Sequence, residues 1–259
     1  MVWSCLVSIL PGMAQTEKLT DYVNPFVGTD GYGNVYPGAQ IPFGGIQISP
    51  DTDSRFYDAA SGYKYNHLTL MGFSLTHLSG TGIPDLGDFL FIPGTGEMKL
   101  EPGTHEDPDQ GYRSRYSHDK EWASPNYYAV ELADYGVKAE MTSGVRSGMF
   151  RFTYPESDNA FIMIDMNHTL WQSCEWSNLR MINDSTITGY KLVKGWGPER
   201  HVYFTATFSK KLTGLRFVQD KKPVIYNTSR FRSSYEAWGK NLMACISFDT
   251  KAGEEVTVK

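Results

Sequence analysis

The second half of this sequence is a series of short runs in which apolar and polar residues alternate, and turn residues end each run. Such runs occupy residues 127–132, 137–142, 146–154, 160–166, 202–208 and 242–248. Alternation with a period of two places one side of a strand in a core, and closely spaced turns join antiparallel neighbours. The sequence shows no amphipathic helix longer than two turns. It therefore predicts an all-β chain, an antiparallel sandwich or barrel, with long loops and at most short helices.

Weaker patterns predict further strands along the chain. They lie at residues 41–48, 63–65, 89–92, 112–118, 185–192, 215–218, 223–226 and 255–259. Residues 68–75 are apolar enough for a core strand, with a helical turn as the alternative. The last strand reaches Lys259 without a turn or a polar tail, which indicates a sequence that continues in a longer protein.

Composition narrows the class of partner. Of the 259 residues, 41% are hydrophobic, which is ample for a real core. The net charge is −5 and the 24 Lys and Arg residues are scattered, so the electrostatic footprint of a nucleic-acid binder is missing. Neutral or cationic small ligands fit this net charge better than nucleic acid does. No apolar run approaches the ~18 residues that are needed to span a bilayer.

Residues 1–14 resemble an export signal. An apolar segment is followed by a proline and by Gly12-Met13-Ala14, the spacing of small residues that a signal peptidase reads. The segment is short and lacks a basic start, as a truncated signal would, and a buried terminal strand is the alternative. Export would place the protein in the periplasm or outside the cell. Without this segment two cysteines remain, Cys174 and Cys245, which either pair or stay as buried thiols.

The stretch from Asn24 to Asp88 is too rich in glycine, proline and aromatic residues to be a simple connector. Between Gly28 and Gly38 no lysine follows the glycines, and no helix follows the loop, so a phosphate cradle is excluded. Tyr32 and Tyr36 stand among glycines, where a sugar ring can stack, and Asp30 or Asn34 can bind hydroxyls. The alternative is a purely structural Ω-loop.

The back of this stretch holds histidines and carboxylates. His67 and His77 with Asp85 and Asp88 lack the spacing of a metal site, so His67 is interpreted as structural. His77 precedes the tight turn Ser79-Gly80-Thr81-Gly82, which would hold its ring near the first loop if the two loops pack together. Asp85 and Asp88 are a possible acid and base pair, but Leu86-Gly87 between them suits a turn better.

Four tryptophans are either sugar platforms or core. Trp196 lies between Gly195 and Gly197-Pro198, which predicts a loop position. Trp171, Trp176 and Trp238 are interpreted as core residues.

Several motifs, in order, resemble the N-terminal part of glycoside hydrolase family 92, which comprises calcium-dependent exo-α-mannosidases. They are Tyr22-Val23-Asn24-Pro25-Phe26-Val27-Gly28-Thr29, Tyr36-Pro37-Gly38-Ala39, Pro42-Phe43-Gly44, Ser49-Pro50-Asp51-Thr52, Ser61-Gly62-Tyr63, Thr76-His77-Leu78-Ser79-Gly80-Thr81-Gly82, Asp85-Leu86-Gly87-Asp88 and Tyr116-Ser117-His118-Asp119-Lys120-Glu121. The resemblance covers nearly the whole chain after the signal.

The resemblance implies a β-sandwich of the supersandwich type over residues 20–259, packed on a C-terminal (α/α)6 barrel. In the family the catalytic acid, the catalytic base and most calcium ligands belong to that barrel, so the resemblance implies that this chain alone is inactive. It implies a mannose-containing glycan as substrate. The residues expected to form one wall of its pocket are Gly28, Thr29, Asp30, Gly31, Tyr32, Tyr36, Phe56, Tyr57, His77, Gly80, Thr81 and Trp196.

The chain departs from the family pattern at two places that bear on linkage preference. Residues 55–60 replace a Trp-rich loop, and Tyr32 and Asn34 stand where many members have histidine. The α-1,2 linkage is the commonest in the family and is the expectation here. The competing hypothesis is a stand-alone carbohydrate-binding module that holds a glycan on Tyr32, Tyr36 and Trp196.

Overall fold

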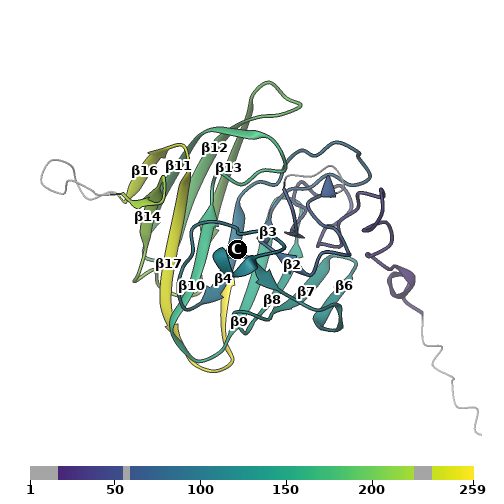
Figure 1. The fold of residues 1–259 in the computed structure, drawn as a ribbon, viewed down its shortest axis with the longest axis horizontal. Helices are drawn as coiled ribbons and strands as arrows, with labels where there is room; N and C mark the ends of the chain where they lie inside the picture. The colour runs from purple at the N-terminus through teal and green to yellow at the C-terminus, as the bar shows by residue number, and fades with distance from the viewer. Residues whose placement is uncertain (1–16, 55–58, 225–234) are drawn as a thin grey trace, which may run out of the picture.

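The computed structural model describes residues 17–54, 59–224 and 235–259 of the chain. Regular structure in this part is nearly all antiparallel strand (Figure 1). The helical segments are short 3-10 turns, namely η1 (Leu19–Tyr22), η3 (Pro108–Gln110) and η4 (His118–Lys120). The predicted all-β class with at most short helices is confirmed. The expected signal at residues 1–14 lies outside the described residues.

The largest sheet has seven strands and is buried on both faces near its centre. In spatial order they are β1 (Ser49–Asp51), β3 (Gly72–Ser74), β4 (Leu90–Thr95), β10 (Ser157–Asp165), β17 (Leu242–Thr250), β14 (Arg216–Gln219) and β15 (Lys222–Pro223). In β10, Ile162 and Ile164 enter one apolar cluster, whereas Phe161 and Met163 enter another. Burial on both faces explains why β10 is a nearly continuous apolar run.

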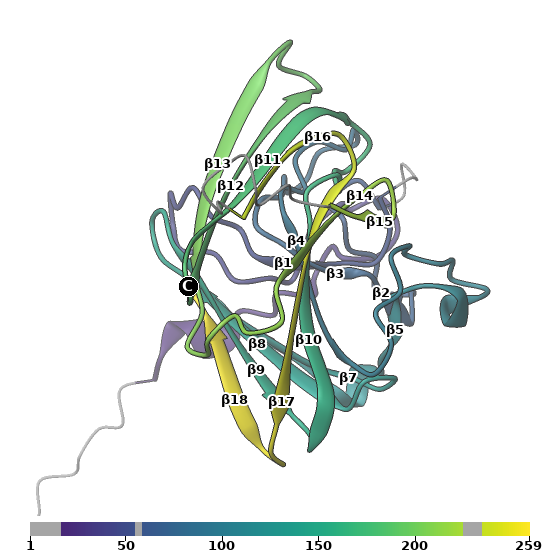
Figure 2. The ribbon, with the colours of Figure 1, turned by 90° about the vertical axis from the view of Figure 1, so that its left-hand side faces the viewer.

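Two smaller sheets cover one face of the seven-stranded sheet (Figure 2). One consists of β13 (Arg200–Thr207), β12 (Thr186–Lys194), β11 (Ser173–Asn183) and β16 (Glu236–Gly239). The other consists of β18 (Glu254–Val258), β9 (Gly148–Tyr154), β8 (Val137–Ser143), β7 (Tyr127–Leu132) and β6 (Glu121–Ser124). Strands β2 (Thr69–Leu70) and β5 (Ser114–Arg115) form a separate pair.

The core lies between these layers. Phe91 of the large sheet packs on Phe150 of β9 with ring centroids 4.9 Å apart, and Phe89 packs on Phe204 of β13 at 4.6 Å. Full burial of such a side chain contributes roughly 1.5–3 kcal/mol. The two covering sheets meet edge to edge, because Thr207 and Lys259 exchange backbone hydrogen bonds of 2.8 and 2.9 Å. The architecture is a sandwich and not a closed barrel.

The predicted strand at residues 41–48 is wrong. Only Ile48 pairs, in an isolated bridge with Ala39, and Gly44 N–H donates to Ile41 in a turn. Phe43 has a φ of +60° and is fully exposed, which no core strand allows. Residues 63–65 also form no strand. Residues 68–75 form β2 and β3, so the helical alternative for them is excluded.

The sequence patterns missed β11, one of the longest strands. Ser177 and Asn178 are buried in its middle, where an alternating pattern would require one apolar residue, and Ser177 Oγ donates to the Gly239 carbonyl at 2.8 Å. A satisfied buried polar side chain is stable but hides the pattern. The alternatives left for the cysteines are also resolved. Cys174 and Cys245 are free and buried, and burial raises the pKa of both thiols.

Candidate functional site

Three loops that are distant in sequence form one rim at an end of the sandwich. Gly80 N–H donates to the Asn34 carbonyl at 2.7 Å, which joins the two ends of the glycine-rich stretch. Trp196 N–H donates to Asp85 Oδ2 at 3.1 Å, which adds the connection between β12 and β13. We call residues 28–36, 77–88 and 195–200 together the loop rim. The first two loops thus pack together, which is the condition under which His77 would lie near the first loop.

The first loop of the rim needs its glycines. Gly28 and Gly31 have φ values of +85° and +59°, in the left-handed region that other residues avoid. At Gly33 a Cβ atom would lie 2.2 Å from the Gly28 carbonyl oxygen. That carbonyl accepts a hydrogen bond from Val35 N–H at 3.2 Å, which closes the loop. The result is a rigid loop that holds Tyr32, with an exposed fraction of 92%, at its tip.

A fully buried carboxylate, Asp51, lies beneath the rim. His77 Nε2 is 2.7 Å from Asp51 Oδ1, and His168 Nε2 is 2.7 Å from Asp51 Oδ2. His77 Nδ1 lies 2.7 Å from the Gln47 carbonyl, so both ring nitrogens face acceptors and both donate when the ring is an imidazolium. Burial favours the neutral acid, but the two histidines outweigh it and hold the pKa of Asp51 well below its usual range.

A second buried carboxylate, Asp88, is neutralised by bases from the far half of the chain. Lys191 Nζ lies 3.1 Å from Asp88 Oδ1, and Arg200 pairs with Asp88 Oδ2. Burial opposes ionisation, but these cations hold the pKa of Asp88 below its usual range. Lys191 Nζ also donates to the His168 carbonyl at 2.6 Å, which connects the Asp88 centre to the Asp51 centre.

The structure excludes Asp85 and Asp88 as an acid and base pair. Asp88 is inaccessible and fully paired, and Asp85 accepts hydrogen bonds from the backbone N–H groups of Leu86 and Trp196. Leu86 and Gly87 both have a φ of +75°, so this segment is the turn that its spacing favoured. His67 contacts Thr52 Oγ1 at 3.0 Å, as a structural histidine would.

Sequence reasoning gave no role to Glu121, which is the centre of a third buried cluster. Its carboxylate accepts from Tyr63 Oη at 3.0 Å and from Tyr128 Oη at 2.5 Å, and it lies 2.6 Å from His118 Nδ1. These contacts join two of the quoted motifs, the one around Tyr63 and the one that ends at Glu121. A carboxylate with three tyrosine or histidine neighbours holds loops together.

The predicted substrate residues fall into two groups. The accessible ones on the rim are Gly28, Asp30, Gly31, Tyr32, Gly80, Thr81 and Trp196. The buried ones beneath it are Thr29, Tyr36 and His77. The Tyr36 and His77 rings lie 5.1 Å apart, so these two side chains support the loops from below. Phe56 and Tyr57 lie outside the described residues.

The interpretation of three tryptophans as core residues is wrong. Trp171, Trp176 and Trp238 have exposed fractions of 56%, 45% and 54%. Trp176 and Trp238 belong to the outward side of strands whose inward side fills the core, and aromatic content alone does not identify the side. Trp196 is 60% exposed and lies in a loop, as predicted.

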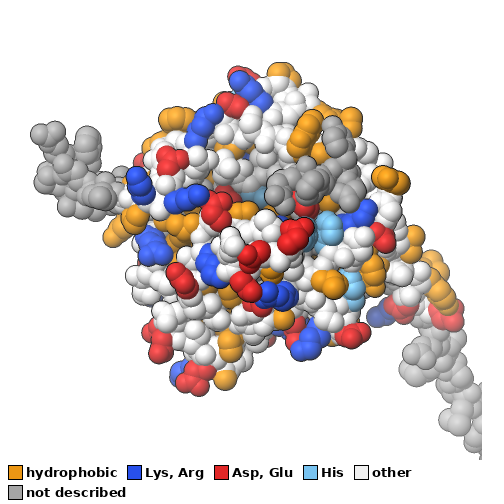
Figure 3. All heavy atoms as spheres, viewed as in Figure 1, with side chains coloured by type: hydrophobic (Ala, Val, Ile, Leu, Met, Phe, Trp, Pro, Cys, Tyr) orange, Lys and Arg blue, Asp and Glu red, His pale blue; other side chains and the backbone are white. Residues whose placement is uncertain are grey.

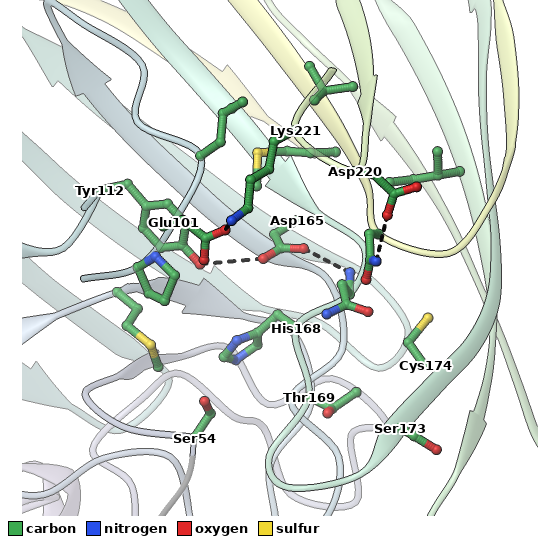
Figure 4. A pocket seen from close by; sticks show the side chains of 18 of the residues that line it. Ser54, Glu101, Tyr112, Asp165, His168, Thr169, Ser173, Cys174, Asp220 and Lys221 are labelled. Atoms are coloured by element: carbon green, nitrogen blue, oxygen red, sulfur yellow. Dashed lines mark hydrogen bonds and ion pairs between the residues drawn. The ribbon is translucent and has the colours of Figure 1, made fainter. Parts of the chain in front are cut away.

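A polar cavity of about 980 Å³ lies on the outer face of the seven-stranded sheet (Figure 4). Tyr112 Oη donates to Asp165 Oδ2 at 3.4 Å within it, and Glu101 pairs with Lys221 at its edge. His168 lines the cavity and also bonds to Asp51, so the cavity adjoins the buried Asp51 centre beneath the rim. Its lining comes from separate segments between residues 54 and 243, which leaves no local signal in the sequence.

In the parts of the chain that the structure describes, no three His, Cys, Asp or Glu side chains are arranged to hold a metal ion. The donor set here does not fit the calcium that the family resemblance implies, so we derive no step through it. Positive and negative side chains are interspersed on the face seen in Figure 3. Among the helices that the structure describes, none has the length and apolar character to cross a membrane.

Comparisons with known proteins agree with this architecture. The model of the glycosyl hydrolase family 92 N-terminal domain matches residues 22–259. The family 92 glycosyl hydrolase ccman5 superposes with a TM-score of 0.75 at 26% identity, over 93% of this chain and 32% of that protein. The family 92 inverting mannosidase BT2199 of Bacteroides thetaiotaomicron VPI-5482 superposes with a TM-score of 0.74 at 24% identity, over 94% of this chain and 31% of that protein.

A further relative is an uncharacterized secreted glycosidase of Arthroderma benhamiae, 30% identical over 139 residues, which is 53% of this chain and 17% of that protein. The chain thus spans about a third of the solved relatives and less of this one. The matched family model covers the sandwich, the loop rim and both buried carboxylate centres. The chain belongs to glycosyl hydrolase family 92, whose N-terminal domain it contains.

Proposed function

We propose that this chain is the N-terminal domain of an exported, inverting exo-α-mannosidase, and that the loop rim forms one wall of its active-site pocket. Family membership supports the glycoside class. The relative named an inverting mannosidase and the relative named a secreted glycosidase suggest the substrate and the location. The first substrates to test are α-1,2-linked mannosides.

The observation that carries the proposal is an accessible rim on a rigid base. Tyr32 and Trp196 offer ring faces for the apolar side of a sugar, and the exposed Asp30 carboxylate offers hydrogen bonds to hydroxyls. The Asp51 and Asp88 centres fix these loops before a ligand arrives. Loops fixed in this way lose little entropy on binding, as a substrate-positioning wall requires.

The catalytic carboxylates are proposed to lie elsewhere in the protein. Inversion uses an acid and a base roughly 6.5–9.5 Å apart with a water between them. The buried carboxylates under the rim are inaccessible, because Asp51 is held by two histidines and Asp88 by Lys191 and Arg200. We therefore assign the acid, the base and the calcium to a C-terminal (α/α)6 domain that faces the rim.

The test compares the 259-residue chain with the full-length protein on mannobioses, with calcium and with a chelator. We expect no mannose release by the 259-residue chain, and release by the full-length protein that begins with the β anomer in NMR spectra. Calcium-dependent release by the 259-residue chain would show that the catalytic groups lie within it. Initial release of the α anomer would contradict inversion.

The stand-alone binding module is less well supported. It requires stacking on Tyr32, Tyr36 and Trp196, but Tyr36 is only 7% exposed and its ring lies against His77. The two accessible rings, Tyr32 and Trp196, are the same ones that a pocket wall would use.

A further inference from the structure

The outer face of the four-stranded sheet carries a row of aromatic side chains on strands β11, β12, β13 and β16. Inward residues of these strands, such as Leu179 and Ile187, fill the core, so their neighbours point outward. The register then places Tyr203 of β13 beside Tyr190 of β12, Tyr190 beside Asn178 of β11, and Asn178 beside Trp238 of β16. The row crosses all four strands, whose position in the fold is seen in Figure 2.

The rings of this row are accessible and ordered. Tyr203 is 70% exposed and Trp238 is 54% exposed. The Tyr190 and Tyr203 rings lie 4.9 Å apart at 35°, and Tyr190 Oη is 3.0 Å from His201 Nδ1. Trp176, 45% exposed, pairs with Leu192 in the adjacent row. Four strands spaced by ~4.8 Å extend this platform over about 14 Å.

Hydrogen-bonding groups stand between the rings. Asn178 Nδ2 donates to Glu236 Oε1 at 3.3 Å, and Arg180 is opposite Glu236 in the register. Glu175 pairs with Lys240 at 3.3 Å at the edge of the face. The guanidinium of Arg180 and the carboxylate of Glu236, beside flat rings, match a pyranose chain, whose C–H faces stack on rings while its hydroxyls both donate and accept.

A protein partner fits this face less well. The centres of protein interfaces are depleted of Lys and Glu, whereas here Glu236 adjoins the aromatic row and Glu175 pairs with Lys240 at its edge. Because the charges along this face include opposite pairs, a neutral ligand matches it better than a strongly charged one.

We propose that the outer face of the four-stranded sheet, centred on Tyr190, Tyr203, Trp176 and Trp238, is a binding surface for an extended neutral polysaccharide. It lies on the strands themselves and not on the rim loop that joins β12 to β13, and it does not depend on the proposed function.

The test is affinity electrophoresis of the 259-residue chain in gels that contain a soluble α-mannan or a soluble β-glucan, followed by calorimetry on the better probe. Trp238→Ala and Trp176→Ala should each weaken binding by about tenfold, because one stacked ring is lost. Trp122→Ala is the matched control, since Trp122 is 46% exposed but lies on β6 of another sheet. Trp196→Ala, on the rim, is the second control.

The surface would be supported if the gel retards the wild-type chain, if Trp238→Ala and Trp176→Ala bind the polymer more weakly, and if the two control variants bind it as the wild type does. No retardation by either polymer, or equal binding by all variants, would overturn it. Loss of binding only in Trp196→Ala would place the glycan on the rim, which overturns this inference and supports the proposed function. Self-association that these two substitutions abolish, without glycan binding, would identify a protein-docking face instead.

Discussion

The two buried carboxylate centres beneath the rim both connect distant segments of the chain, but the side chains that hold each carboxylate differ. Asp51 is held by two imidazoles, from His77 and His168, whereas Asp88 is held by the permanent cations Lys191 and Arg200. Both carboxylates are completely buried. Each joins a segment of the first ninety residues to a strand or loop beyond residue 165.

The two sets of partners give the two centres different properties. Lys and Arg neutralise a charge over the whole accessible pH range, so the Asp88 centre is an ionic anchor. The imidazole of His77 instead bonds at both nitrogens, to Asp51 and to the Gln47 carbonyl, and so fixes its ring in one orientation. The Asp51 centre therefore sets geometry, and removing either centre should affect the rim in a distinct way.

Lys191→Met should be the most destabilising change. It leaves a buried carboxylate with one cation fewer, and breaking a buried pair in this way costs about 3–5 kcal/mol. The measurement is chemical unfolding of the 259-residue chain. Lys194→Met, on the same strand but exposed, is the control and should change the unfolding free energy by less than about 0.5 kcal/mol. Equal effects of the two substitutions would contradict the anchor.

Asp51→Asn should cost less, about 1–3 kcal/mol, because the amide oxygen still accepts one of the two hydrogen bonds. The measurement is again chemical unfolding. NMR spectra should also show altered His77 and His168 ring signals, since the shared acceptor has changed. Asp30→Asn is the control, because the Asp30 side chain is 57% exposed and its Oδ1 lies 3.9 Å from Lys64 Nζ, at the limit of an ion pair. A variant with native stability and native ring signals would show that Asp51 does not set the geometry.

Neither centre is visible in the sequence. The contact between His168 and Asp51 spans 117 residues, and that between Arg200 and Asp88 spans 112. The motifs identified Asp51, His77 and Asp88 as unusual but not their partners, because strand order decides which distant residues meet. Local pattern did predict β7 and β8 almost to the residue, since both strands alternate cleanly and a turn joins them.

The wrong predictions share a physical cause, which is that burial depends on the neighbouring layer. Trp176 and Trp238 are large and apolar, yet they face outward, because the inward side of their strands already fills the core. Residues 41–48 are apolar, yet Pro42 and the turn at Gly44 keep that segment out of a sheet. Hydrophobicity indicates that a residue can be buried, but the layers decide whether it is.

Acid should show how much the ionised Asp51 carboxylate contributes to stability. Each carboxyl has a folded pKa below its usual 3.8, so below that pH the unfolded chain binds a proton that the folded chain does not. Each contribution is thus present above pH 3.8 and is lost as the pH falls through the folded pKa, at up to about 1.4 kcal/mol per pH unit per group. Unfolding from pH 5 to pH 2 should show a shallower fall for Asp51→Asn than for wild type. Other carboxyls titrate in both proteins, so parallel curves would show that Asp51 is not depressed.

The smallest effect on stability is expected at the rim surface itself. Tyr32→Ala removes a 92% exposed ring, so the unfolding free energy should change by less than about 0.5 kcal/mol. In the full-length protein the same change should lower kcat/KM on mannobioses by about tenfold, because a stacking contact with the sugar is lost. Tyr22→Ala, also exposed but outside the rim, should leave both quantities unchanged. If Tyr32→Ala keeps full activity, the rim tip does not contact the substrate, and the two buried centres then stabilise a fold and not a binding wall.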